Sequence, residues 1–363
     1  MSKLKPVCLG QGTPYLDSDQ AIRKFVIKAI NDNKVDKYTD SQGVLGIREL
    51  ISKKLKEEGM EYNPEEIVLT TGALETIHCI FLSLQKYKNP EVLIPVPTYF
   101  RYFELAKLAG VNLIPVPLNE EKNWDLDIDL LKQKITPNTK AILICSPNNP
   151  TGNIIPKDKI LEVCKLAKSK NIKVIMDDIY STFCFEGKLF NPATKSEFKD
   201  TIIRVVSFSK TYSLTGWRIG YVHSDIKNIQ PIFDMHSTIS ICAPAVSQYA
   251  GMGALLSGER IAKETFEIYK MNRTLMGDCL EKMPQLEVAW PQGGYYFFPK
   301  IKGLKNDVIF CRELKRQQNL TVSPGSSFGS GGEGHVRICF GKSESDIKEG
   351  MKRLANFLKD FKN

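Results

Sequence analysis

Short apolar runs alternate with longer amphipathic stretches between about residues 66 and 225. Each run is five residues long, as is typical of buried strands, and the runs cover residues 66–70, 92–96, 112–116, 141–145, 173–177 and 202–206. Apolar residues recur at helical spacing over 73–87, 99–109 and 157–170, which predicts helices between several of the strands. Because strands and helices alternate, we expect an α/β domain with a mostly parallel sheet sandwiched by helices.

The pattern changes towards the C-terminus. A long helix is predicted over 257–283, followed by an apolar run at 294–299, a strand at 336–340 and a helix at 344–361. This order predicts a smaller α+β domain, and the N-terminal segment is expected to join it. With 363 residues available, we expect a large cofactor-binding domain of residues 30–260 and a discontinuous small domain of residues 1–29 and 261–363.

The composition is that of a folded globular protein, with 42% hydrophobic and 25% charged residues. The net charge is +9, because 50 basic residues outnumber 41 acidic ones. The lysines are dispersed among acids along helical segments, and no stretch interleaves basic and aromatic residues, so we expect no nucleic-acid partner. The positive balance suits an anionic cofactor and an anionic substrate.

Neither a membrane partner nor secretion is expected. No apolar run reaches the ~18 residues that a membrane span needs, and the N-terminus has no long apolar core of a signal peptide. None of the nine cysteines forms a CxxC pair, and several lie in apolar runs. They are typical of core residues in a reducing compartment, which predicts a cytoplasmic protein without a metal site.

The most informative segment follows the apolar run at 202–206. It contains Ser207, Ser209 and Lys210, and then Arg218 next to glycines. A lysine amine can form a Schiff base with an aldehyde. Hydroxyls and a guanidinium can hold a phosphate. A surface lysine would explain Lys210 alone, but the whole string predicts a covalently held, phosphate-bearing cofactor.

Other special residues also follow predicted strands. Gly72 lies between the run at 66–70 and a helix, where backbone N–H groups can approach a phosphate. Asp177 and Asp178 end another run; two acids there are compatible with a solvated turn or a metal site, but no histidine is near them in sequence. The string 146–152, Ser-Pro-Asn-Asn-Pro-Thr-Gly, indicates a tight loop after the run at 141–145.

In their order and spacing, these strings resemble the pyridoxal-phosphate-dependent class I/II aminotransferases, the aspartate aminotransferase superfamily of fold type I. The resemblance extends from about residue 8 to residue 341 and covers nearly the whole chain. It implies pyridoxal 5′-phosphate as the cofactor, bound as an aldimine of Lys210. It also implies transfer of an amino group from an L-amino acid to a 2-oxo acid in a ping-pong sequence.

The resemblance further implies individual roles. Catalysis falls to Lys210, Asp177 and Tyr180, with Asp177 on the pyridine nitrogen, where a carboxylate keeps the ring protonated. Substrate contacts fall to Arg337, which grips the α-carboxylate, and to Asn149 and Gly12. The cofactor contacts implied are Gly72, Ala73, Leu74, Tyr99, Asn149, Asp177, Tyr180, Ser207, Ser209, Lys210, Arg218 and, from the partner subunit, Tyr38.

A contact by Tyr38 of a neighbouring subunit requires at least a dimer, so a homodimer with shared active sites is expected. The segment before Gly10 is shorter than the arm with which many family members hold their partner, which leaves the strength of the dimer open. The donor amino acid also stays open. Tyr99, Tyr102, Tyr295 and Tyr296 fit an aromatic pocket or a packed core equally well, and Arg101 fits a substrate carboxylate or solvent.

Two other functions are compatible with parts of this pattern. A C–S β-lyase would share nearly all of these residues and differ in its side-chain pocket. A regulator that binds the cofactor without catalysis would need an attached DNA-binding domain and could dispense with catalytic groups. Because all the proposed catalytic groups are present, the sequence favours an enzyme, and an aminotransferase (transaminase) among the enzymes.

Overall fold

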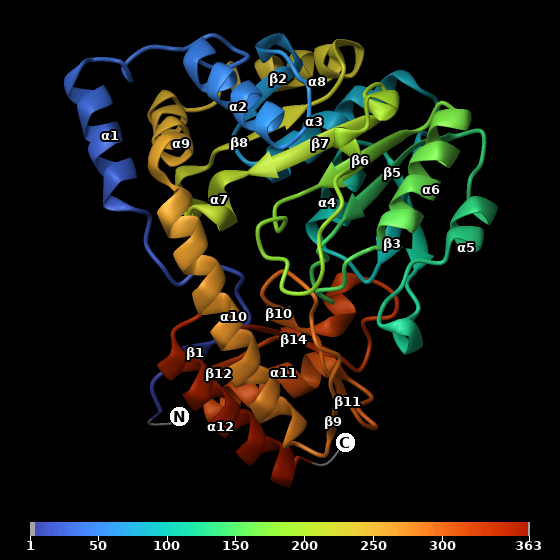
Figure 1. Ribbon diagram of the computed structural model, residues 1–363. Coiled ribbons are helices and arrows are strands. Elements are labelled where there is room, and N and C mark those ends of the chain that lie inside the picture. Colours follow the sequence, from blue (N-terminus) through green and yellow to red (C-terminus); the bar gives the residue numbers. More distant parts are fainter. Residues whose placement is uncertain (1–3, 362–363) are drawn as a thin grey trace.

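The computed structural model describes residues 4–361 and shows a large sheet layer above a smaller unit (Figure 1). The large sheet has seven strands in the spatial order β2 (Ile67–Thr70), β8 (Gly220–His223), β7 (Ile202–Ser207), β6 (Lys173–Asp177), β5 (Thr139–Cys145), β3 (Glu91–Val96) and β4 (Asn112–Pro117). The last five are mutually parallel, whereas β8 is antiparallel to both of its neighbours. The predicted α/β fold with a mostly parallel sheet is confirmed.

Helices cover both faces of this sheet, so its strands are buried on both sides. Alternate strand residues face opposite layers: Val92 and Ile94 of β3 belong to one apolar cluster, and Leu93 belongs to another. The helices of this part are α1 (Gln20–Asn31), α2 (Leu45–Glu57), α3 (Ala73–Ser83), α4 (Arg101–Leu108), α5 (Ile128–Gln133), α6 (Lys157–Ser169), α7 (Phe208–Thr211), α8 (Ile226–Ser240) and α9 (Ala245–Ser257).

The helix α10 (Glu259–Glu281) runs from the large sheet layer into the smaller unit (Figure 1). There, α11 (Asp307–Gln318) and α12 (Glu344–Asp360) pack with three small sheets: β10 (Tyr296–Phe297) with β14 (Val336–Cys339) and β13 (Ser323–Pro324), β11 (Lys300–Ile301) with β9 (Leu286–Glu287), and β1 (Val7–Cys8) with β12 (Leu320–Thr321).

The N-terminal segment contacts both parts of the molecule. Its strand β1 pairs with β12 of the smaller unit, whereas α1 packs against α9 beside the large sheet. The domain boundaries expected from the sequence stay a prediction. No helix within residues 4–361 is long and apolar enough to cross a bilayer.

Candidate active site

A cavity of about 610 Å³ lies where the carboxyl ends of β5, β6 and β7 approach the smaller unit. Ligands in parallel α/β sheets collect beyond this edge of the strands. Most of the residues predicted for the site line this cavity: Gly12, Ala73, Leu74, Tyr99, Asn149, Tyr180, Ser207, Ser209, Lys210, Arg218 and Arg337. Residues from distant parts of the sequence therefore share one space.

Lys210 lies on α7, a single short turn at the end of β7. Its Nζ donates a hydrogen bond to the Gly12 carbonyl at 2.6 Å. Burial lowers the pKa of Lys210 to about 8, and the positive charges of Arg337 and Arg218 act in the same direction. The amine is therefore unprotonated at mildly alkaline pH, as a nucleophile or a general base requires.

One end of the cavity has the form of an anion cradle. Gly72 is the N-cap of α3 with φ +96°, and a Cβ at this position would lie 2.8 Å from Nη2 of Arg218. Arg218 itself has φ +55° and donates to the carbonyls of Thr71 and Thr215 at 3.0 and 3.2 Å. A guanidinium is thus fixed beside the start of a helix whose first N–H groups are free, which suits a phosphate.

Asp177 ends β6 and does not line the cavity, because its carboxylate is buried. Tyr102 of α4 donates its hydroxyl proton to Oδ2 at 2.6 Å, and the N–H of Ile179 donates to Oδ1 at 3.3 Å. Burial raises the pKa of Asp177 to about 6, while the bond from Tyr102 acts in the opposite direction. The carboxylate is therefore ionised at neutral pH and able to pair with a protonated ring nitrogen.

Arg337 lines the same cavity from β14 of the smaller unit. Nη1 donates to Oδ1 of Asn149 at 2.9 Å, and Nη2 donates to the Gly10 carbonyl at 2.5 Å. The guanidinium also lies over the ring of Tyr296, 4.4 Å from its centroid. Buried Nε has no hydrogen-bond partner within the described chain, so this arginine retains capacity for a carboxylate.

The hydroxyl of Tyr180 lies 3.1 Å from the hydroxyl of Tyr296, and both residues line the cavity. The Gly12 carbonyl accepts a second hydrogen bond from Tyr295 at 3.0 Å. A Cβ on Gly12 would lie 1.8 Å from the Tyr296 hydroxyl, so only glycine fits between these groups. The N-terminal segment is thereby held against the lysine turn.

Two predicted residues lie away from the cavity wall in addition to Asp177. Gly72 lies directly beside the guanidinium of Arg218. Tyr38 does not reach the site of its own chain, because it lies on an exposed loop with 76% of its surface accessible. The sequence left Tyr102 and Tyr295 open between an aromatic pocket and a packed core. In the structure both are buried and donate hydrogen bonds, Tyr102 to Asp177 and Tyr295 to the Gly12 carbonyl, a role that the sequence did not predict.

An α/β fold with a buried lysine between an anion cradle and a paired arginine defines a class of cofactor-dependent enzymes. The family model for aminotransferases of class I and II matches residues 5–354. A probable aspartate/prephenate aminotransferase of Aquifex aeolicus is 33% identical over 97% of this chain and 91% of its own length. An aromatic-amino-acid aminotransferase of Thermococcus litoralis is 31% identical over 98% of this chain and 92% of its own. A solved aspartate aminotransferase of Thermotoga maritima superimposes with a TM-score of 0.92 at 28% identity, covering 98% of this chain and 92% of that one.

The chain belongs to the class I and II aminotransferases. It is accordingly a transaminase that uses pyridoxal phosphate and acts on amino acids and 2-oxo acids. The names of the relatives do not favour the C–S β-lyase considered above.

Proposed function

We propose that Lys210 is the catalytic lysine of this aminotransferase and the point at which pyridoxal phosphate is covalently attached. The observation that carries this proposal is the position of its amine. It is half-buried and lines one cavity together with Arg218, which follows β7 of the large sheet, and Arg337, which lies on β14 of the smaller unit. The cofactor's phosphate fits the cradle, and an amino acid's carboxylate fits the arginine. When bound, the cofactor supplies a ring that accepts electrons from the substrate's α-carbon.

The side chains of this protein supply the binding and the proton transfers. Arg337 holds the α-carboxylate, with Asn149 fixing the direction of its Nη1. With the cofactor bound, the Lys210 amine would take the α-proton of the substrate as a general base and give it back as a general acid. Asp177 would keep the ring nitrogen of the cofactor protonated, and Tyr180 and Asn149 would hydrogen-bond to its ring oxygen. Two such half-reactions, with an amino acid and then a 2-oxo acid, give ping-pong kinetics.

The same proposal includes a homodimer and a cytoplasmic location. In the dimer, Tyr38 reaches the phosphate in the partner's site, which accounts for an exposed aromatic residue on a loop. All nine cysteines lie within the described part of the chain and are free thiols, which supports a reducing compartment.

The test is the visible absorption of the purified protein before and after addition of single L-amino acids without a 2-oxo acid. We expect a yellow band that bleaches while one equivalent of 2-oxo acid is released per site. Lys210→Ala should bind the cofactor only reversibly, so that borohydride fixes none of it, and should lose turnover. Substantial transamination by Lys210→Ala would refute the assignment. Pyruvate and ammonia that accumulate without an acceptor would instead indicate a lyase.

A further inference from the structure

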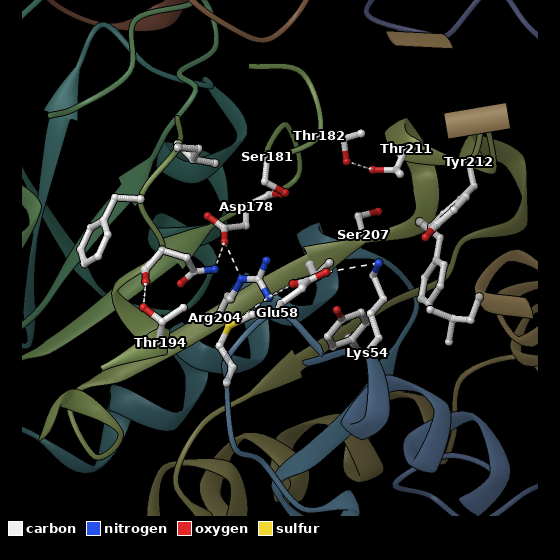
Figure 2. A pocket seen from close by; sticks show the side chains of 18 residues that line it. Lys54, Glu58, Asp178, Ser181, Thr182, Thr194, Arg204, Ser207, Thr211 and Tyr212 are labelled. Atoms are coloured by element: carbon white, nitrogen blue, oxygen red, sulfur yellow. Dashed lines mark hydrogen bonds and ion pairs between the residues drawn. The ribbon is translucent and has the colours of Figure 1, made fainter. Parts of the chain in front are cut away.

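A second cavity, of about 470 Å³, adjoins the lysine turn (Figure 2). It lies between α2, β7, β8, α7 and the loop that follows β6. Ser207 lines both this cavity and the active site, and Phe208 and Thr211 line it from the two ends of the turn that carries Lys210. The mechanism above uses none of the charged groups in this second cavity.

Two basic and two acidic side chains in its wall are joined by three ion pairs, one of them between Nη1 of Arg204 and Glu58 at 4.0 Å. Nε of Arg204 donates to Oδ2 of Asp178 at 2.5 Å, and both side chains are almost fully buried. Nζ of Lys54 lies 3.2 Å from a carboxylate oxygen of Glu58, the residue just after the end of α2. Figure 2 shows these side chains bordering the same space. The protein itself therefore neutralises these charges, and no ligand is needed to do so.

Three hydrogen-bond donors in this wall have no acceptor among the described residues. Arg204 uses Nε for Asp178, and Nη1 meets the sulfur of Met60 and a ring nitrogen of His223, but Nη2 makes no hydrogen bond within residues 4–361. The hydroxyls of Tyr212 and Tyr221 also make none with the described residues.

The two phenols share one space with the charged groups. Tyr221 is 4% exposed, and its hydroxyl interacts electrostatically with Arg204, Glu58 and Tyr212. Burial raises the pKa of Tyr221, so its hydroxyl keeps its proton and remains a donor. None of the three donor atoms is among the fully enclosed unpaired atoms of the described chain, so each faces the open space of the cavity. A ligand that brings oxygen acceptors would find donors there.

The rest of the wall indicates what the ligand carries besides oxygen. Leu189, Phe190, Val206 and Leu255 give the cavity an apolar side. We infer that this cavity binds a small organic acid, whose carboxylate accepts from Nη2 of Arg204 and from the hydroxyls of Tyr212 and Tyr221, and whose apolar body packs against these side chains. The volume suits such a molecule, since ligand pockets span about 300–1,000 Å³. Inorganic phosphate lacks the apolar body.

Phenylacetate is a suitable probe because it has neither an amino nor an oxo group to react. Equilibrium dialysis of the cofactor-loaded enzyme with labelled phenylacetate should find two sites per chain: the active site, which needs Arg337, and this cavity. Arg337→Gln should remove the first site. The double variant Tyr212→Phe/Tyr221→Phe should remove the second and leave transaminase activity unchanged, since neither hydroxyl has a partner in the described part of the protein. Each single variant, Tyr212→Phe or Tyr221→Phe, should weaken phenylacetate binding at the second site roughly tenfold.

Tyr62→Phe is the matched control, because its buried hydroxyl also has no partner among the described residues but does not line the cavity. It should keep both sites. Phenylacetamide, which has the same shape without the charge, should not compete for the second site. The proposal would be overturned if dialysis found a single site per chain and Arg337→Gln removed it. It would also be overturned if the double variant still bound phenylacetate at two sites. Equal competition by phenylacetamide or by inorganic phosphate at the second site would overturn the assignment to an organic acid.

Discussion

Replacing Tyr102 with phenylalanine removes one hydroxyl and tests whether Asp177 governs cofactor binding. The hydroxyl donates to the buried carboxylate at 2.6 Å and favours its ionised form. Without it, the pKa of Asp177 should rise above its value of about 6. A hydrogen bond to a charged group contributes roughly 1.5–3 kcal/mol, and 1.36 kcal/mol corresponds to about one pKa unit, so the expected rise is roughly 1–2 units.

The direction of the pH effect follows from which form of Asp177 pairs with the ring nitrogen. In the proposed role of Asp177, the ionised carboxylate pairs with a protonated nitrogen, so affinity for pyridoxal phosphate should be present above the pKa of Asp177 and should be lost as the pH falls through it. In the wild type this loss should be centred near pH 6. In Tyr102→Phe it should be centred roughly one to two pH units higher, for the reason just given. The affinities should therefore differ by up to about tenfold near pH 7 and converge at pH 9.

The assay is titration of the apoenzyme with pyridoxal phosphate between pH 5.5 and 9, followed by the absorbance of the bound cofactor. The ratio of variant to wild-type affinity cancels the titration of the cofactor itself. Tyr62→Phe is the control, because its hydroxyl is buried without a partner in the described chain and does not contact Asp177. A ratio for Tyr102→Phe that is the same at every pH would show lost packing instead of a shifted pKa and would refute the reasoning.

Three further substitutions test other parts of the site. Gly72→Ala places a Cβ 2.8 Å from Nη2 of Arg218 at φ +96°; the backbone strain of roughly 1–3 kcal/mol should weaken cofactor binding about 5- to 150-fold, measured by the same titration, and an unchanged affinity would contradict the cradle. Arg337→Lys loses the two-pronged grip and should raise KM for both amino acid and 2-oxo acid at least tenfold while the cofactor spectrum stays the same; a rise for one substrate alone would contradict a shared carboxylate site. Asp178→Asn leaves buried Arg204 without its counter-charge and should lower the free energy of unfolding by about 3–5 kcal/mol in urea denaturation, whereas a loss under 1 kcal/mol would show that the pair is dispensable.

Much of the fold could be predicted from the sequence because burial leaves a local pattern. The strands β3, β5, β6 and β7 are mostly apolar, as is typical of strands covered on both faces, although β7 includes Arg204 and β6 ends with Asp177. The strand β8 was not predicted, because its four residues follow Arg218 closely without a distinct apolar run of their own. Its antiparallel direction depends on the path of the chain, which no local pattern specifies.

The sequence alone also predicted which residues carry the chemistry. Lys210, Asp177 and Asn149 each follow a predicted strand. Because the carboxyl ends of parallel strands share one edge of a sheet, the strand pattern predicts that these residues lie near one another, and Lys210 and Asn149 do line one cavity in the structure. Family resemblance added Arg337, which lies far away in the sequence and on the smaller unit.

Only the tertiary structure decided how those groups are tuned. The bond from Tyr102 to Asp177 joins residues 75 positions apart, and the bond from Arg337 to Gly10 joins residues 327 positions apart. The lowered pKa of Lys210 and the raised pKa of Asp177 both come mainly from burial, which depends on every element packed around them. Local sequence specifies the type and spacing of a side chain. Its solvation and its partners arise from packing between segments that are distant in the chain, and these set its charge and its reactivity.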